Sequence, residues 1–83
     1  MKKRLNVKLQ QKVVLEAIDD RGDLLRPLRA TQTAVVVEVY PDGSFRTERR
    51  EGGGSKDWSP DGYRYLLYQG TMTPYGGWRV RSQ

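Results

Sequence analysis

The alternation of apolar and polar residues near the N-terminus decides the expected fold class. Every second position from residue 5 to residue 17 is apolar except Gln11. The apolar residues are Leu5, Val7, Leu9, Val13, Leu15 and Ala17. A period of two is typical of a β-strand with one buried face, whereas on a helix these residues would scatter around the circumference. A helix stays open as the alternative, because "LQQKVVLEAIDDRG" holds good helix formers and a glycine at which a helix could end. We expect a strand over residues 5–18, with a bulge or break near Gln10 and Gln11.

Residues 33–40, "TAVVVEVY", form the strongest predicted strand. Both of its faces are largely apolar at its start, which is typical of a central strand. The following "YPDGSF" places proline, aspartate and glycine in the order of a short hairpin turn. The return strand "SFRTERR" has Phe45 as its only large apolar residue, which predicts an exposed or edge strand.

The rest of the chain predicts further short strands. A polar turn at "DDRGD" precedes Leu24 and Leu25, and "GYRYLLYQG" followed by a strand starting at Trp78 indicates a final hairpin. The expected fold is therefore mainly β: a single domain over residues 1–83 with five to six antiparallel strands. The economical architecture is a small bent sheet or a partly open barrel of the SH3-like or OB-like kind.

The stretch "TERREGGGSKDWSPDG", residues 47–62, separates the two halves of this pattern. A linker between domains is disfavoured, because the residues after it supply too few strands to fold alone. We predict instead a flexible loop at 51–61, mobile at Gly52–Gly54 and anchored again by Trp58 and the Pro60–Gly62 turn. As a binding loop it would act together with Arg49, Arg50 and Lys56, and this interpretation requires Trp58 to lie outside the core.

Composition excludes several kinds of chemistry. The chain has no cysteine and no histidine, which removes disulfides, thiolate ligands, a cysteine nucleophile and the commonest general base. The segment "EGGGS" fits neither the Walker nor the dinucleotide pattern. The acidic "DDRGD" has neither a glycine at the sixth position of a calcium loop nor the distal glutamate. We therefore expect no cofactor, no metal and no enzymatic activity. A remote alternative is a small ribonuclease that uses Arg46, Glu48, Arg64 and Tyr65.

Hydropathy and the N-terminal residues give an expected location. No apolar run approaches the roughly 20 residues that span a bilayer. The basic start "MKKRLNVKLQQ" is not followed by the apolar stretch of an export signal. We expect no membrane partner and a cytoplasmic location.

Basic and aromatic residues interleave in the C-terminal half, and this pattern provides the candidate site. The net charge is +5, from 15 Lys and Arg against 10 Asp and Glu. Guanidinium groups pair with phosphates, and aromatic rings give bases a stacking surface. The predicted nucleic-acid-binding residues, for DNA or RNA, are Arg46, Arg49, Arg50, Lys56, Trp58, Arg64, Tyr65, Arg79 and Arg81. In the structural alternative, the aromatics fill the core and the arginines cover the solvent side of the strands.

The same residue types also favour a protein partner. Tyr, Trp and Arg are enriched at protein–protein hot spots, so the surface could bind an acidic protein instead. The alternative function is thus a protein-binding accessory or inhibitor, of the type that phages and mobile elements encode, acting through the 51–61 loop and exposed aromatics. Pairing of apolar edge strands could also form a homodimer.

Overall fold

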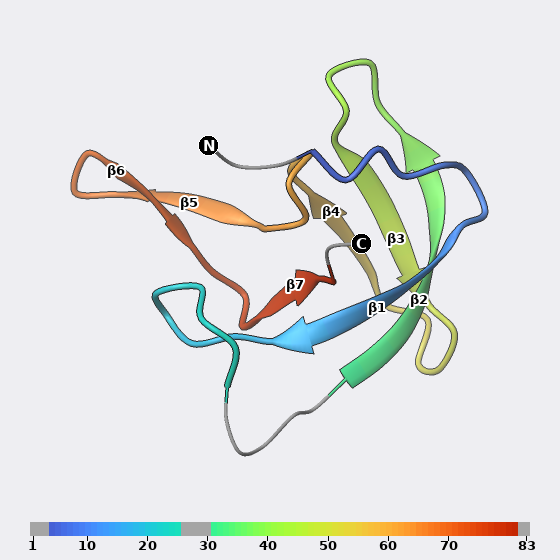
Figure 1. Ribbon diagram of the computed structural model, residues 1–83, viewed down its shortest axis with the longest axis horizontal. Coiled ribbons are helices and arrows are strands. Elements are labelled where there is room, and N and C mark those ends of the chain that lie inside the picture. The colour runs from blue at the N-terminus through green and yellow to red at the C-terminus, as the bar shows by residue number, and fades with distance from the viewer. Residues whose placement is uncertain (1–3, 26–30, 82–83) are drawn as a thin grey trace.

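Seven strands form two antiparallel sheets in the computed structural model, which describes residues 4–25 and 31–81 (Figure 1). The strands are β1 Lys12–Ala17, β2 Thr31–Val39, β3 Phe45–Arg49, β4 Ser55–Trp58, β5 Tyr65–Tyr68, β6 Thr71–Pro74 and β7 Trp78–Val80. Five of them form a half-barrel sheet in the order β4-β3-β2-β1-β7, and β5 and β6 form a sheet of their own. The expected mainly β fold with a partly open barrel is confirmed, although with more strands than the five to six predicted.

The N-terminal alternation does form a strand, but only in part. Within β1, Val13 and Leu15 are buried, as a period of two requires. The strand interpretation of residues 12–17 is therefore confirmed and the helical alternative is wrong. The expected break also occurs, because the chain turns just before β1 and Gln10 adopts a φ of 68°. Leu5 and Val7 precede this turn and still pack against the core.

The core fills the concave face of the half-barrel. It consists of Val13, Leu15, Ala34, Val36, Phe45, Trp58 and Val80, with Leu5, Val7 and Trp78 packed against it. Phe45 and Trp58 lie opposite each other on β3 and β4, and both are fully buried. The Trp58 Nε1–H donates a hydrogen bond of 2.7 Å to Thr47 Oγ1, so the indole is buried with its polar atom satisfied.

Strand β2 occupies the centre of the sheet, as its apolar faces predict. Its pairing with β3 shifts register between Val36 and Glu38, which marks a bulge at Val37. A bulge bends its strand and increases the local twist, so it helps to curl the sheet into a half-barrel. The predicted turn after β2 is confirmed: Gly43 has a φ of 92° and donates its N–H to the Tyr40 carbonyl.

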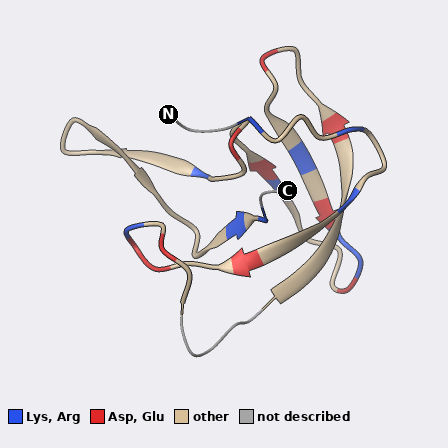
Figure 2. Ribbon diagram, in the orientation of Figure 1, with Lys and Arg blue, Asp and Glu red and all other residues tan. Residues whose placement is uncertain are grey.

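Strand β3 is not the exposed or edge strand that its charged sequence predicts. Figure 2 shows charged positions along β3, but Phe45 and Thr47 on its other face are buried. The prediction is wrong because β4 pairs along the free side of β3 and becomes the edge itself. The prediction of a loop over residues 51–61 is also wrong in part, because residues 55–58 form β4.

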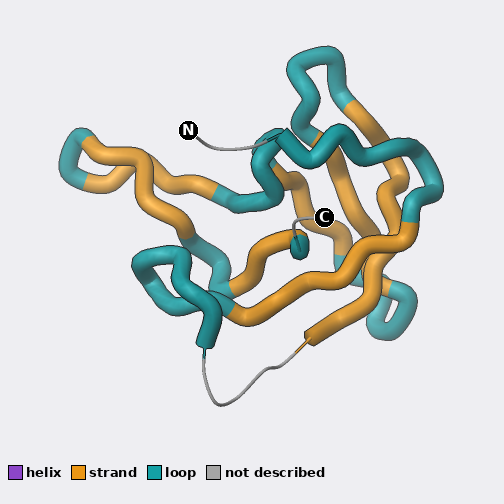
Figure 3. Tube along the Cα trace, in the orientation of Figure 1, coloured by secondary structure: helices purple, strands orange, loops and turns teal. Residues whose placement is uncertain are grey.

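The predicted final hairpin has the wrong partners. Strand β5 pairs with β6, while β7 pairs with β1 on the main sheet. The reason is the turn at Gln69 and Gly70, whose φ angles of 50° and 77° are those of a two-residue type I′ hairpin. Figures 1 and 3 show the resulting β5–β6 hairpin extending away from the half-barrel.

A tight turn spans the gap where the half-barrel stays open. Of the described strands, the two at the ends of the sheet, β4 and β7, do not pair with each other. The second Pro-Asp-Gly turn lies beside them: Leu5 N–H donates to the Pro60 carbonyl and Val80 N–H to the Gly62 carbonyl, both at 2.8 Å. Gly62 has a φ of 87°, and a Cβ there would approach Leu5 Cδ1 to 2.6 Å, so the turn needs glycine.

Residues 4–25 and 31–81 contain no helix long and apolar enough to cross a bilayer.

Candidate nucleic-acid interface

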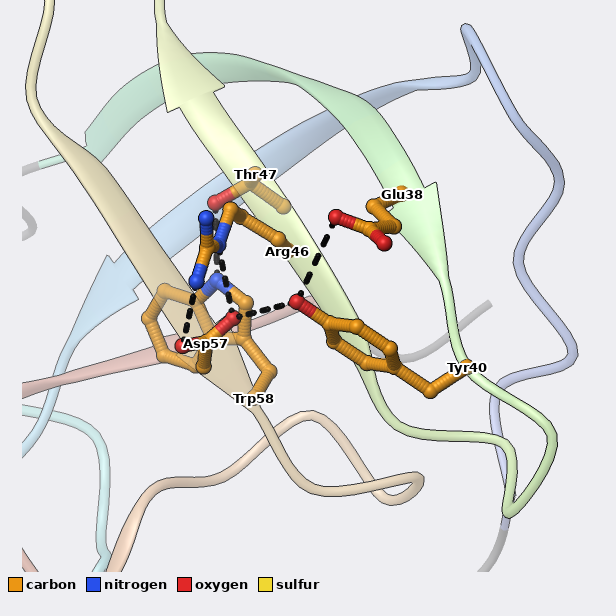
Figure 4. Close-up of polar contacts among 6 residues, drawn as sticks. All are labelled: Glu38, Tyr40, Arg46, Thr47, Asp57 and Trp58. Carbon is orange, nitrogen blue, oxygen red and sulfur yellow. Dashed lines mark hydrogen bonds and ion pairs between the residues drawn. The ribbon is translucent and has the colours of Figure 1, made fainter.

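Arg46 lies on the outer face of β3 and is held in an ion pair (Figure 4). Its Nε and Nη2 donate to the two carboxylate oxygens of Asp57 at 2.9 and 3.2 Å. The Tyr40 hydroxyl donates to Asp57 at 3.3 Å and approaches Glu38 at 3.5 Å. The hydrogen bonds from Arg46 hold the pKa of Asp57 below its ordinary value. Arg46 of β3 is thus paired with the carboxylate of Asp57 on β4 and is not an unpaired cation.

Arg79 and Arg81 are likewise paired, in this case with Glu16 of β1. Arg79 Nη2 and Arg81 Nε lie 3.4 and 3.2 Å from the two Glu16 oxygens. Arg79 Nη1 also donates to the Tyr63 hydroxyl at 2.8 Å. The Glu16 side chain is only 15% exposed, so this cluster joins β1 to β7, while the Arg81 side chain remains 52% exposed.

Two predicted aromatic contacts are also occupied elsewhere. Trp58 is 1% exposed, so the prediction that it contacts nucleic acid is wrong: its ring packs on Phe45 in the core and cannot stack on a base. Tyr65 donates its hydroxyl to Asp61 at 2.6 Å, and burial followed by this hydrogen bond raises its pKa well above the usual value. Because Trp58 sits in the core, the interpretation of residues 51–61 as a binding loop is wrong.

Three of the four remaining predicted cations gather where the concave face opens beyond the core. Arg49 lies on the same face of β3 as the buried Phe45 and Thr47 and is the next residue on that face after Thr47. Lys56 of β4 lies opposite Thr47 and therefore shares this face. Its Nζ reaches across to 5.9 Å from the ring centroid of Trp78 on β7.

Arg64 completes this group from the segment before β5. Its guanidinium lies 4.6 Å from the Tyr75 ring centroid, and Nη2 donates to the Tyr75 hydroxyl at 3.0 Å. We call Arg49, Lys56 and Arg64, with the rings of Tyr75 and Trp78, the cationic mouth. Within the described part of the chain, none of its three cations forms an ion pair.

The electrostatics of the cationic mouth are those of an unsatisfied positive site. Burial lowers the pKa of Lys56, and the charges of Arg64 and then Arg49 lower it further. Each cation therefore raises the free energy of its charged neighbours. A bound anion would reverse this effect, because a negative charge favours the protonated form of Lys56.

An open depression of about 770 Å³ adjoins the mouth at Arg49. Arg50 lines it together with Glu51, and Thr31, Gln32 and Thr33 of β2 form its other wall. Arg50 is exposed here, so it extends the basic surface beyond the mouth, while Glu51 offsets part of that charge. Over residues 4–25 and 31–81, no cluster of acidic residues could hold a metal ion.

The four residues of the ribonuclease alternative are distributed over different parts of the structure. Arg46 and Glu48 alternate with the buried positions of β3 and so face outward. Arg64 stacks on Tyr75 in the mouth, and the Tyr65 hydroxyl is bonded to Asp61. The structure therefore does not assemble them into one constellation.

Tyr75 and Trp78 are the site residues that the predicted set lacks. The sequence signal for Trp78 is its alternation with Val80, which places both side chains on one face of the closing strand. Val80 is buried and Trp78 packs against the core, so this face is the one that Lys56 approaches.

Together, the fold and the mouth define a small antiparallel β domain whose apolar core is bordered by a basic, aromatic-lined opening. No protein-family model, curated protein or solved structure matches this chain.

Proposed function

We propose that this protein is a nucleic-acid-binding module that holds a single-stranded segment in its cationic mouth. The observation that carries the proposal is the gathering of Arg49, Lys56 and Arg64 from three separate elements without a carboxylate partner in the described residues. Phosphates of a nucleic-acid backbone supply the missing negative charge.

The two rings of the mouth favour a single strand over a duplex. Trp78 is partly exposed and Tyr75 is 38% exposed, so each retains surface that a base can cover. Unpaired bases present their faces to such rings, whereas the bases of a duplex are already stacked on each other. The cations above both rings would meet the adjacent phosphates.

The ion pairs elsewhere set the size of the expected electrostatic effect. Arg46, Arg79 and Arg81 already have carboxylate partners, so three cations of the mouth remain for phosphate contacts. With three phosphates neutralised, the slope of log affinity against log salt is about −2 for a single strand. Raising salt from about 50 to about 200 mM should then weaken binding roughly twentyfold.

Fluorescence polarisation with labelled oligothymidylate tests the proposal. Lys56→Gln should weaken binding and reduce the magnitude of the salt slope by about 0.7, because one phosphate contact is lost. Lys12→Gln is the matched control: it removes the same charge from an exposed position of β1, outside the mouth, and should leave the slope unchanged. An abasic strand of equal length isolates the stacking contribution and should bind at least about tenfold more weakly.

Three results would contradict the proposal. The first is no binding of single strand, duplex or RNA at low salt. The second is equal affinity for oligothymidylate and the abasic strand, since the rings would then contribute nothing. The third is an equal loss of affinity in Lys12→Gln and Lys56→Gln, which would indicate attraction by net charge alone.

A further inference from the structure

Among the described residues, the β5–β6 hairpin carries more exposed large apolar side chains than any other strand pair. Leu66, Leu67, Tyr68 and Met72 are 53%, 66%, 61% and 56% exposed. An isolated two-stranded hairpin is marginally stable in water, and contiguous exposed apolar side chains mark a binding surface. The hairpin therefore has the features of an element that is completed by a partner.

The absence of charge narrows the kind of partner. Residues 65–78 contain no Lys, Arg, Asp or Glu, although these make up 30% of the chain. Figure 2 shows the hairpin as uncharged beyond the start of β5. A partner that binds through charged groups would find no side chain of opposite charge on this hairpin. A second copy, which also carries +5, can approach with least repulsion through this segment.

The backbone shows which edge of the hairpin can accept a strand. Tyr75 N–H donates to the Arg64 carbonyl, and the register pairs Leu67 with Met72. Since hydrogen-bonded and non-hydrogen-bonded pairs alternate along an antiparallel ladder, the N–H and C=O of Leu67 point to the outer edge of β5. On the outer edge of β6, Pro74 has no N–H to donate. Met72 also points its N–H and C=O outward on β6, but the missing N–H of Pro74 interrupts the ladder there, so the edge of β5 accepts a strand more readily.

We propose that β5 pairs antiparallel with β5 of a second copy about a two-fold axis at Leu67. Each Leu67 N–H would donate to the Leu67 carbonyl of the other copy, joining the two hairpins into a four-stranded sheet. On one face the Leu67 and Met72 side chains of both copies form a continuous apolar row. On the other, Leu66 of each copy lies opposite Tyr68 of its twin. The small contact area makes this a weak dimer that exchanges rapidly.

Sedimentation velocity from about 10 µM to about 1 mM tests the association, with concentration-dependent amide shifts to locate it. The wild type should dimerise with shifts confined to the hairpin. Leu67→Lys should weaken dimerisation at least tenfold, because it places two like charges against each other at the axis. Thr71→Lys adds the same charge to the same hairpin on β6, away from the seam, and should weaken it less than twofold.

A mixing experiment tests the two-fold arrangement itself. Leu67→Lys and Leu67→Glu should each be monomeric alone, whereas their equimolar mixture should associate, because the two changed side chains meet at the axis. Circular dichroism confirms that both variants keep the β structure. Lys56→Gln should dimerise like the wild type, so this inference can fail without the nucleic-acid proposal failing, and the reverse.

Four outcomes would overturn the inference. One is a wild type that stays monomeric at the highest concentration with unchanged hairpin shifts. Another is a Leu67→Lys variant that dimerises as well as the wild type. A third is a mixture of the two charge variants that stays monomeric. The last is a monomer whose hairpin binds phosphatidylcholine vesicles, which would make lipid the partner of these side chains.

Discussion

Replacing Thr47 with valine should destabilise the fold through a single buried hydrogen bond. The Thr47 hydroxyl accepts from Trp58 Nε1–H at 2.7 Å, and both residues are 1% exposed. Valine keeps the shape and volume of threonine, so no cavity opens. The change leaves the Trp58 N–H buried without an acceptor, where water cannot reach it.

The expected magnitude follows from that orphaned donor. A buried donor left unsatisfied costs about 1–3 kcal/mol, so we expect Thr47→Val to lower the free energy of unfolding by about 2 kcal/mol. For a domain of this size, that loss lowers Tm by about 10 °C. Trp58→Phe removes the N–H donor itself. In the Thr47→Val background, this second substitution should therefore lower the free energy of unfolding by less than it does in the wild type.

Urea denaturation followed by tryptophan fluorescence measures this loss, because Trp58 passes from the core to solvent on unfolding. Thr33→Val, at an exposed position of β2, is the matched control and should stay within about 0.5 kcal/mol of the wild type. The reasoning is refuted if Thr47→Val is as stable as this control with an unchanged m-value.

Three further changes test other parts of the fold. Gly62→Ala should lower the free energy of unfolding by about 2–4 kcal/mol in thermal denaturation, because its Cβ would lie 3.0 Å from the Val80 carbonyl at a positive φ. Gly53 also has a positive φ but open space around it, so Gly53→Ala should lower it by only about 1 kcal/mol. Equal losses in the two variants would contradict this reasoning. Because the folded pKa of Asp57 is lowered from 3.8, its contribution to stability is present above that pH and is lost as pH falls through the folded value; Asp57→Asn should therefore show a smaller acid-induced drop in the urea midpoint. Gln69→Asn should slow hydrogen exchange in the β5–β6 hairpin alone, since asparagine accepts the positive φ of a type I′ turn more readily, and unchanged or faster exchange would count against that turn assignment.

Local sequence pattern predicted those strands that carry their own alternation of apolar and polar residues or are followed by a recognisable turn. Strand β2 and the turn after it were predictable because alternating valines and a Pro-Asp-Gly turn are local signals. Strand β4 was missed because "SKDW" has one apolar residue in four positions. Its strand conformation depends on pairing with β3, whose buried face needs Trp58 to complete it.

The candidate site was predictable in composition but not in assembly. The sequence identified the cations, whereas their availability depends on distant carboxylates. Arg46 is neutralised from β4 and Arg79 from β1, and neither pairing has a local signal. Trp58 was misplaced for a related reason: a tryptophan among glycines and charges looks exposed until its strand is known.

The position of β1 in the sheet has a consequence for how the chain folds. β1 lies between β2 and β7, so one of its edges pairs with a strand from the far end of the sequence. Such long-range pairing is slow because the loop-closure entropy is lost before the contact forms. We expect the β2–β3–β4 meander to form first and β7 to close onto β1 last. Trp58 reports the meander and Trp78 the closing strand, so in stopped-flow refolding the Trp78 signal should lag behind that of Trp58; coincident phases would mean that the sheet forms in one step.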